Sequence, residues 1–151
     1  MSFLQSKNCL RILLCILTIC IVASTRLTAR ATELNNADLL GTWKLTKLLD
    51  SSEISSIDDD EAAALVGQFL VITLHQVTLA GEACRKPPKF TRHYEDTAKY
   101  VRETAHAPVG RLGLPTTVEA VELACTEALI KGHNKMVVYW KGYFFDAAKQ
   151  D

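Results

Sequence analysis

The stretch LLGTWKLTKLL, residues Leu39–Leu49, decides the fold class of this chain. Trp43 and Leu45 alternate with threonine and lysine residues, and this period of two is typical of a β-strand with one buried and one hydrated face. Gly41 precedes the Trp by two positions and allows a tight turn or a close backbone approach, so that the indole can plug one end of a core. The stretch predicts a mainly β fold that starts with this strand.

The first 31 residues have the layout of a secretory signal peptide. Lys7 and Arg11 precede the apolar run Ile12–Ala23, and the sequence Ala-Arg-Ala at positions 29–31 is a small-x-small cleavage site. The run is shorter than the roughly 20 residues of a transmembrane helix. We therefore expect residues 1–31 to be removed and the protein to be periplasmic or extracellular.

Charge and length describe the remaining chain. Four of the 17 basic residues and none of the 17 acidic residues lie in positions 1–31, so residues 32–151 carry 13 basic and 17 acidic side chains and a net charge of −4. This balance disfavours nucleic acid as a partner. The length suits a single domain. Contact with a membrane is expected only through an uncleaved signal or through a lipid anchor on Cys20.

Cysteine usage agrees with export. Three of the five cysteines lie in the first 31 residues, and only Cys84 and Cys125 remain after cleavage. Two cysteines in an oxidising compartment suggest one disulfide. Such a bridge closes a loop of about 40 residues and stabilises the fold by about 3–4 kcal/mol. The alternative is two separate buried thiols.

The first half of the mature chain predicts a short helix followed by two strands. Asp58 and Glu61 form a capping box, after which Ala62–Val66 continues the helix. Gln68–Leu74 is apolar on both faces and predicts a central, well-buried strand. Val77–Ala80 predicts a strand that returns beside it.

The second half contains one segment that the pattern leaves open. Tyr94–Thr104 predicts a short helix. In Pro115–Ile130 a capping box at the start favours a helix, whereas the alternation around Val121 favours a strand. From Leu129 to the C-terminus, strand and turn residues alternate and predict a β-meander with a turn at Gly142.

The chain offers no catalytic constellation. It lacks a Gly-x-Ser-x-Gly elbow and a phosphate-binding glycine motif. The four histidines, His75, His93, His106 and His133, have no spacing that places two of them on one helical turn, so no zinc site is predicted. We therefore expect a protein without enzymatic activity, catalytic residues, metal or cofactor.

One basic stretch is a candidate surface for a partner. Residues 85–93 contain the cations Arg85, Lys86, Lys89 and Arg92, with two prolines between them. Such a loop predicts a docking patch for an anionic partner. The alternative is a solvated loop that leads into an edge strand.

Aromatic residues give a candidate ligand site. Trp43, Phe69, Trp140 and Tyr143 fall on predicted strands. Side chains of this kind usually fill a core, but a barrel lined with them can also hold an apolar ligand at its open end.

Four short motifs are spread over the mature chain. They are Gly-x-Trp at Gly41–Trp43, Gly-Glu-x-Cys at Gly81–Cys84, Gly-Leu-Pro at Gly113–Pro115 before a segment that ends in Cys125, and Gly-aromatic-Phe-Phe at Gly142–Phe145. Together they resemble small exported bacterial proteins of the lipocalin-like, calycin type. The resemblance implies a small antiparallel barrel with one or two short helices and one disulfide, and it favours a strand within Pro115–Ile130.

These observations give two expected functions. The first is a secreted or periplasmic, non-enzymatic binding protein for a small apolar ligand at the barrel mouth near Trp43 and Trp140. The second is an envelope inhibitor or immunity-type protein that blocks a hydrolase such as lysozyme through the basic loop.

Overall fold

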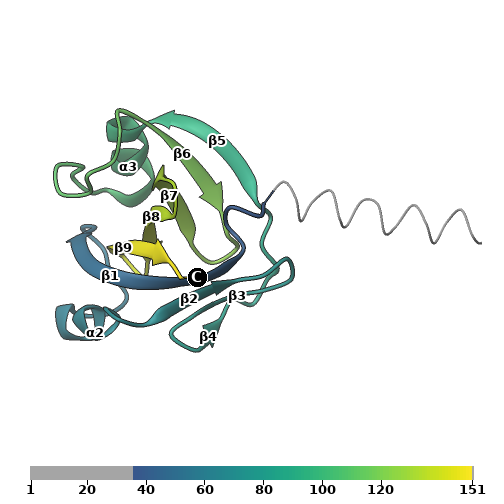
Figure 1. The fold of residues 1–151 in the computed structure, drawn as a ribbon. Helices are drawn as coiled ribbons and strands as arrows, with labels where there is room; N and C mark the ends of the chain where they lie inside the picture. The colour runs from purple at the N-terminus through teal and green to yellow at the C-terminus, as the bar shows by residue number, and fades with distance from the viewer. Residues whose placement is uncertain (1–35, 151) are drawn as a thin grey trace, which may run out of the picture. The chain divides into compact units, whose positions relative to one another are not determined.

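The computed structural model describes residues 36–150, in which nine strands form one antiparallel sheet (Figure 1). The predicted signal, residues 1–31, lies outside the described residues. The strands are β1 (Gly41–Ser51), β2 (Phe69–Ile72), β3 (Val77–Leu79), β4 (Glu82–Ala83), β5 (Thr91–Asp96), β6 (Thr117–Glu122), β7 (Glu127–Gly132), β8 (Lys135–Trp140) and β9 (Tyr143–Lys149). Two helices, α2 (Asp59–Ala64) and α3 (Thr97–Ala105), accompany them.

The sheet is open between β4 and β5. Its strand order is β4-β3-β2-β1-β9-β8-β7-β6-β5, so the first strand pairs with the last while β4 and β5 form the two edges. The predicted closed barrel is therefore not confirmed by the backbone pairing. Two physical reasons are local: β4 has only two residues, and the connection to β5 contains Pro87 and Pro88, which have no N–H to donate to a strand ladder.

The sheet curls so that side chains from both of its ends share one core. Leu79 of β3 and Val121 of β6 are fully buried in the same hydrophobic cluster, together with Trp43, Met136 and Phe145. We call the face that these residues share the inner face. Burial of this apolar surface is the main term that stabilises the curled sheet.

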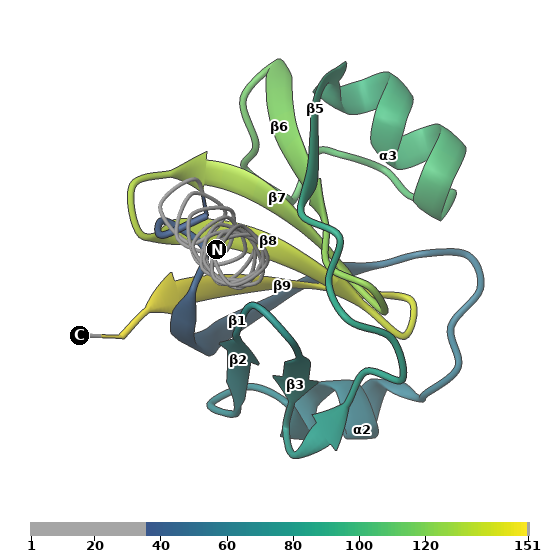
Figure 2. The ribbon, with the colours of Figure 1, turned by 90° about the vertical axis from the view of Figure 1, so that its right-hand side faces the viewer.

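A second cluster covers half of the outer face. Val101 and Ala105 of α3 and Leu112 of the following loop pack against outward side chains of β6–β9, including Val118 and Phe144. Both views of the ribbon show α3 at the end of the sheet that β5 and β6 form, and α2 at the end that β2–β4 form (Figures 1 and 2). The outer face is therefore covered over the part of β6–β9 that carries these side chains.

The outer face of β2 is exposed, which corrects the prediction of a strand buried on both faces. Leu70 and Ile72 point into the core, whereas Phe69 and Val71 are 46% and 36% exposed. The sequence pattern does not indicate which strands α3 packs against. In the structure α3 packs against β6–β9, so the outer side chains of β2 remain exposed.

Several predicted elements are confirmed, and one is shifted. The capping box of α2 is present, since Asp58 and Glu61 each accept a hydrogen bond from the other's backbone N–H. Pro115–Ile130 contains β6 and part of β7, and the C-terminal meander is β7–β9. The predicted helix at Tyr94–Thr104 begins only at Thr97, because β5 stays paired with β6 as far as Asp96. In the described part of the chain, neither helix has the length and apolarity needed to cross a membrane.

Candidate functional site

A surface hollow of about 780 Å³ lies beside α3. We call it the α3 groove. It is lined by the end of β1 and the loop after it, by α3, and by the loop after α3: Asp50, Ser51, Ser52, Glu53, Ala98, Arg102, His106, Ala107, Pro108, Val109 and Gly110. Its volume lies within the range of small-molecule sites, roughly 300–1,000 Å³.

Local sequence sets the orientation of α3 in this groove. Asp96 caps the helix by accepting a hydrogen bond from the Lys99 backbone N–H at 2.9 Å. Val101 and Ala105 are buried against the sheet. Helical spacing then places Ala98 and Arg102, one turn apart, at the groove.

The far wall of the groove is formed where α3 ends. His106 is in the left-handed conformation, with φ of 48°, and this stops the helix. Its carbonyl accepts a hydrogen bond from the Glu53 backbone N–H at 3.4 Å, which ties the loop after β1 to the helix end. Ala107, Pro108 and Val109 add apolar surface. The groove thus combines apolar walls with a few charged side chains, an arrangement that suits a small molecule with an apolar body.

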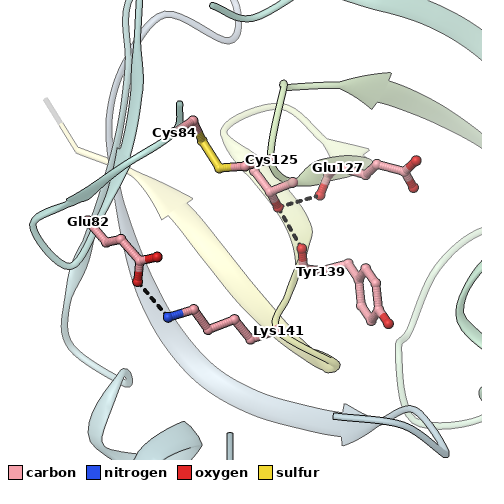
Figure 3. Close-up of a disulfide and its surroundings, with 7 residues drawn as sticks. Glu82, Cys84, Cys125, Glu127, Tyr139 and Lys141 are labelled. Carbon is pink, nitrogen blue, oxygen red and sulfur yellow. Dashed lines mark hydrogen bonds and ion pairs between the residues drawn. A yellow bond between two sulfur atoms is a disulfide. The ribbon is translucent and has the colours of Figure 1, made fainter. Parts of the chain in front are cut away.

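The predicted disulfide is confirmed. Cys84, directly after β4, is bonded to Cys125 in the turn between β6 and β7, with 5.5 Å between the Cα atoms (Figure 3). The bridge connects the β4 edge of the open sheet to the β6–β7 turn, next to the β5 edge. Beside it lies a hollow of about 430 Å³, the disulfide hollow, which is lined by residues that include Arg85, Lys86 and Trp140.

Polar contacts hold the rim around the bridge. The Lys141 ammonium pairs with Glu82 at 2.5 Å (Figure 3). It also lies 5.6 Å from the centre of the Trp140 ring. The Thr126 hydroxyl donates to the Tyr139 carbonyl at 2.6 Å. Near the disulfide, these contacts link β4 to the β8–β9 turn and the β6–β7 turn to β8.

The structure brings together three of the four predicted ligand residues and separates the fourth. Trp43, Trp140 and Tyr143 lie in the inner-face core and are 2%, 5% and 5% exposed, whereas Phe69 lies on the outer face. Trp43 donates from its indole N–H to the Leu39 carbonyl at 2.8 Å. Of the three core aromatics, Trp140 reaches the disulfide hollow.

The predicted basic patch is divided in two. Lys89 pairs with Glu122 at 2.8 Å, and Arg92 pairs with Asp38 at 2.7 Å and Glu119 at 2.9 Å. Burial lowers the pKa of the Arg92 guanidinium, but its hydrogen bonds to the two carboxylates outweigh this effect and raise the pKa overall.

The remaining two cations of the patch, Arg85 and Lys86, are exposed at the disulfide hollow. The stretch as a whole leads into β5, an edge strand, as the alternative interpretation expected.

A chain of three polar side chains was not predicted. The Tyr100 hydroxyl donates to Glu127 at 2.8 Å, and the His93 Nε2 atom forms a hydrogen bond with the Tyr100 oxygen at 3.3 Å. Burial, followed by the bond to Glu127, raises the pKa of Tyr100 well above its ordinary value. The three residues come from β5, α3 and β7, so no sequence spacing signals them. They hold α3 to the sheet.

Comparisons with known proteins give no relative from which a function could be inferred, so the inference rests on the structure. The chain matches no protein-family model, no curated protein and no solved structure. Among residues 36–150, no group of three or more His, Cys, Asp or Glu side chains is arranged to hold a metal ion.

Proposed function

We propose that this chain is an exported, non-enzymatic binding protein that holds a small apolar ligand in the α3 groove. The observation that carries the proposal is the groove itself, with its volume of about 780 Å³ and its apolar walls from α3 and the loop after it. The predicted site at Trp43 and Trp140 offers less surface, because both side chains are packed in the core. Arg102 and His106 line the groove, where their polar groups can bind and orient a polar end of the ligand.

We further propose that the curled sheet is a lipocalin-like barrel with a seam between β4 and β5. Core side chains from both ends of the sheet share one cluster, and the Cys84–Cys125 bridge crosses the seam. A closed barrel of nine strands would need a backbone pairing between β4 and β5. Here the disulfide and the shared apolar core hold those two edges together in its place. This proposal agrees with the Gly41-x-Trp43 resemblance.

Export is supported by the disulfide. A structural disulfide indicates a non-reducing compartment. Together with the predicted signal at residues 1–31, it favours a periplasmic or extracellular location. The intact mass of the protein recovered from its export fraction tests this directly, since it reports both the first residue and the state of the two thiols.

Native mass spectrometry of that same protein, after incubation with a lipid extract, tests the ligand. We expect an adduct of lipid-like mass that Ala98→Trp removes, because the indole fills the groove. Ala63→Trp, on the exposed side of α2, is the matched control and keeps the adduct. A bare mass from every extract overturns the proposal. An adduct that survives Ala98→Trp and is lost with Trp140→Ala moves the site to the disulfide hollow.

A second candidate is an envelope inhibitor that blocks a hydrolase such as lysozyme. It is favoured by Arg85 and Lys86, which are exposed beside the disulfide on a loop held by that bridge. If it is correct, Arg85→Glu with Lys86→Glu abolishes inhibition, while charge reversal at Arg111 and Lys135 leaves it intact. Equal inhibition by both double variants removes this candidate.

A further inference from the structure

The outer face of β1–β3 carries apolar side chains that no helix covers. Phe69 and Val71 of β2 are 46% and 36% exposed, and Val66 just before the strand is 39% exposed. These are three of the five large apolar side chains that are exposed in the described part of the chain, and the other two are Ile54 and Tyr94. Phe69 and Val71 are two positions apart on one strand and therefore share this face, and neighbouring exposed apolar residues are typical of an interaction surface.

Strand register places lysines on the same face. Phe69 lies opposite Lys44 of β1, Lys44 lies opposite Ala148 of β9, and Ala148 lies opposite Lys135 of β8. Residues that are directly opposite in antiparallel strands share a face of the sheet. The row therefore alternates one aromatic residue, a lysine, a small residue and a second lysine. We call this surface, with Val71 and Lys47, the open face.

The lysines of the open face lack partners among the described residues. No ion pair or hydrogen bond of the Lys44, Lys47 or Lys135 side chains is present within residues 36–150. Lys47 lies opposite Asp146, but the Asp146 carboxylate accepts from Lys131 at 2.6 Å. The face therefore presents unneutralised positive charge around an apolar centre, although the mature chain as a whole is acidic.

We propose that the open face binds an anionic phospholipid surface, with Phe69 at the level of the headgroups. Lysines near such a surface are attracted to its negative potential, and an apolar ring such as that of Phe inserts at the boundary between the headgroups and the acyl chains. Two partly exposed apolar side chains form too small a centre for a standard protein interface, which buries about 800 Å² on each partner. They suit the shallow insertion of a peripheral membrane protein.

This inference goes beyond ligand binding and does not depend on it. The α3 groove is lined by the end of β1 and by the α3 region, and it shares no residue with the open face. The sequence predicted membrane contact only through an uncleaved signal or a lipid anchor. The open face adds a route that uses folded residues alone, and failure of one proposal leaves the other standing.

Co-sedimentation with vesicles tests the inference, using protein recovered from its export fraction whose intact mass records its first residue. One vesicle type is phosphatidylcholine alone, and the second contains about one-third phosphatidylglycerol. We expect binding to the second type only, and its loss in about 0.5 M sodium chloride, where screening shortens electrostatic attraction to roughly 4 Å.

Variants separate the open face from the rest of the surface. Lys44→Glu with Lys47→Glu is expected to weaken vesicle binding at least tenfold, since each lysine contributes roughly a fivefold increase in affinity. Phe69→Ser is expected to weaken binding about fivefold, because its insertion is lost. Lys99→Glu with Arg111→Glu, both at exposed positions, matches the first change in charge, and Tyr94→Ser matches the loss of an exposed aromatic ring. Both controls should bind as the unchanged protein does, and urea unfolding confirms that every variant is folded.

Three results overturn the inference. The first is equal binding to both vesicle types, and the second is equal weakening by the variants and their controls. The third is a dimer in analytical ultracentrifugation that Phe69→Ser dissociates while vesicle binding stays unchanged, which would assign the open face to a second copy of the chain.

Discussion

The outer face of one sheet behaves as core at one end and as surface at the other. Phe144 on β9 and Phe69 on β2 both point to this face, yet Phe144 is 1% exposed and Phe69 is 46% exposed. The difference is α3 with its following loop, which packs against outward side chains of β6–β9, Phe144 among them, and does not cover Phe69 or Val71 of β2. Position on a strand thus decides which face a side chain joins, while a separate element decides whether that face is buried.

The strongest test of this contrast is a matched pair of truncations. Phe144→Ala is expected to cost about 3–5 kcal/mol of unfolding free energy, because it removes a fully buried ring and leaves a cavity. Phe69→Ala is expected to change stability by less than about 1 kcal/mol, since half of its ring already meets water. Urea denaturation followed by circular dichroism measures both. Similar costs for the two variants would mean that the open face is covered in solution.

The second prediction concerns the bridge between the two ends of the sheet. Replacing Cys84 and Cys125 together by alanine is expected to cost about 3–4 kcal/mol, chiefly by freeing the unfolded chain. Hydrogen exchange should rise most in β4 and β5, the two edges, and least in β8 and β9, which are paired on both sides. Uniform exchange across the sheet would show that the bridge does not hold the seam.

A smaller effect is expected at the start of the helix that covers β6–β9. Asp96→Ala removes the cap of α3 and should cost about 1 kcal/mol. Asp96→Asn retains an acceptor at the same position and serves as the control, with most of the stability kept. Thermal unfolding of the two variants measures the difference, and equal midpoints would contradict a capping role.

The smallest effect is a pH dependence at Tyr100. Its pKa is raised in the folded state by burial and by Glu127, so folding favours the protonated form. The stabilisation is present below the unfolded pKa of about 10 and is lost as pH rises above that value. Wild-type protein should therefore lose more stability than Tyr100→Phe between about pH 9 and pH 11. Parallel slopes would exclude Tyr100 as the cause.

Local patterns in the sequence determined much of the fold. The alternation around Trp43 predicted β1, the Asp58 and Glu61 capping box predicted α2, and two cysteines left after the signal predicted the disulfide. These features depend on residues that are close in the chain or on the number of residues of one type, so they can be predicted from the sequence.

Tertiary structure alone decided which surfaces remain available. It placed Phe69 away from Trp43 and Trp140, it paired Lys89 and Arg92 with distant carboxylates, and it formed the α3 groove from segments about 50 residues apart. Each of these outcomes depends on where α3 packs and where the sheet stops pairing. Such packing results from many contacts between residues that are distant in the sequence. It therefore cannot be predicted from local sequence patterns.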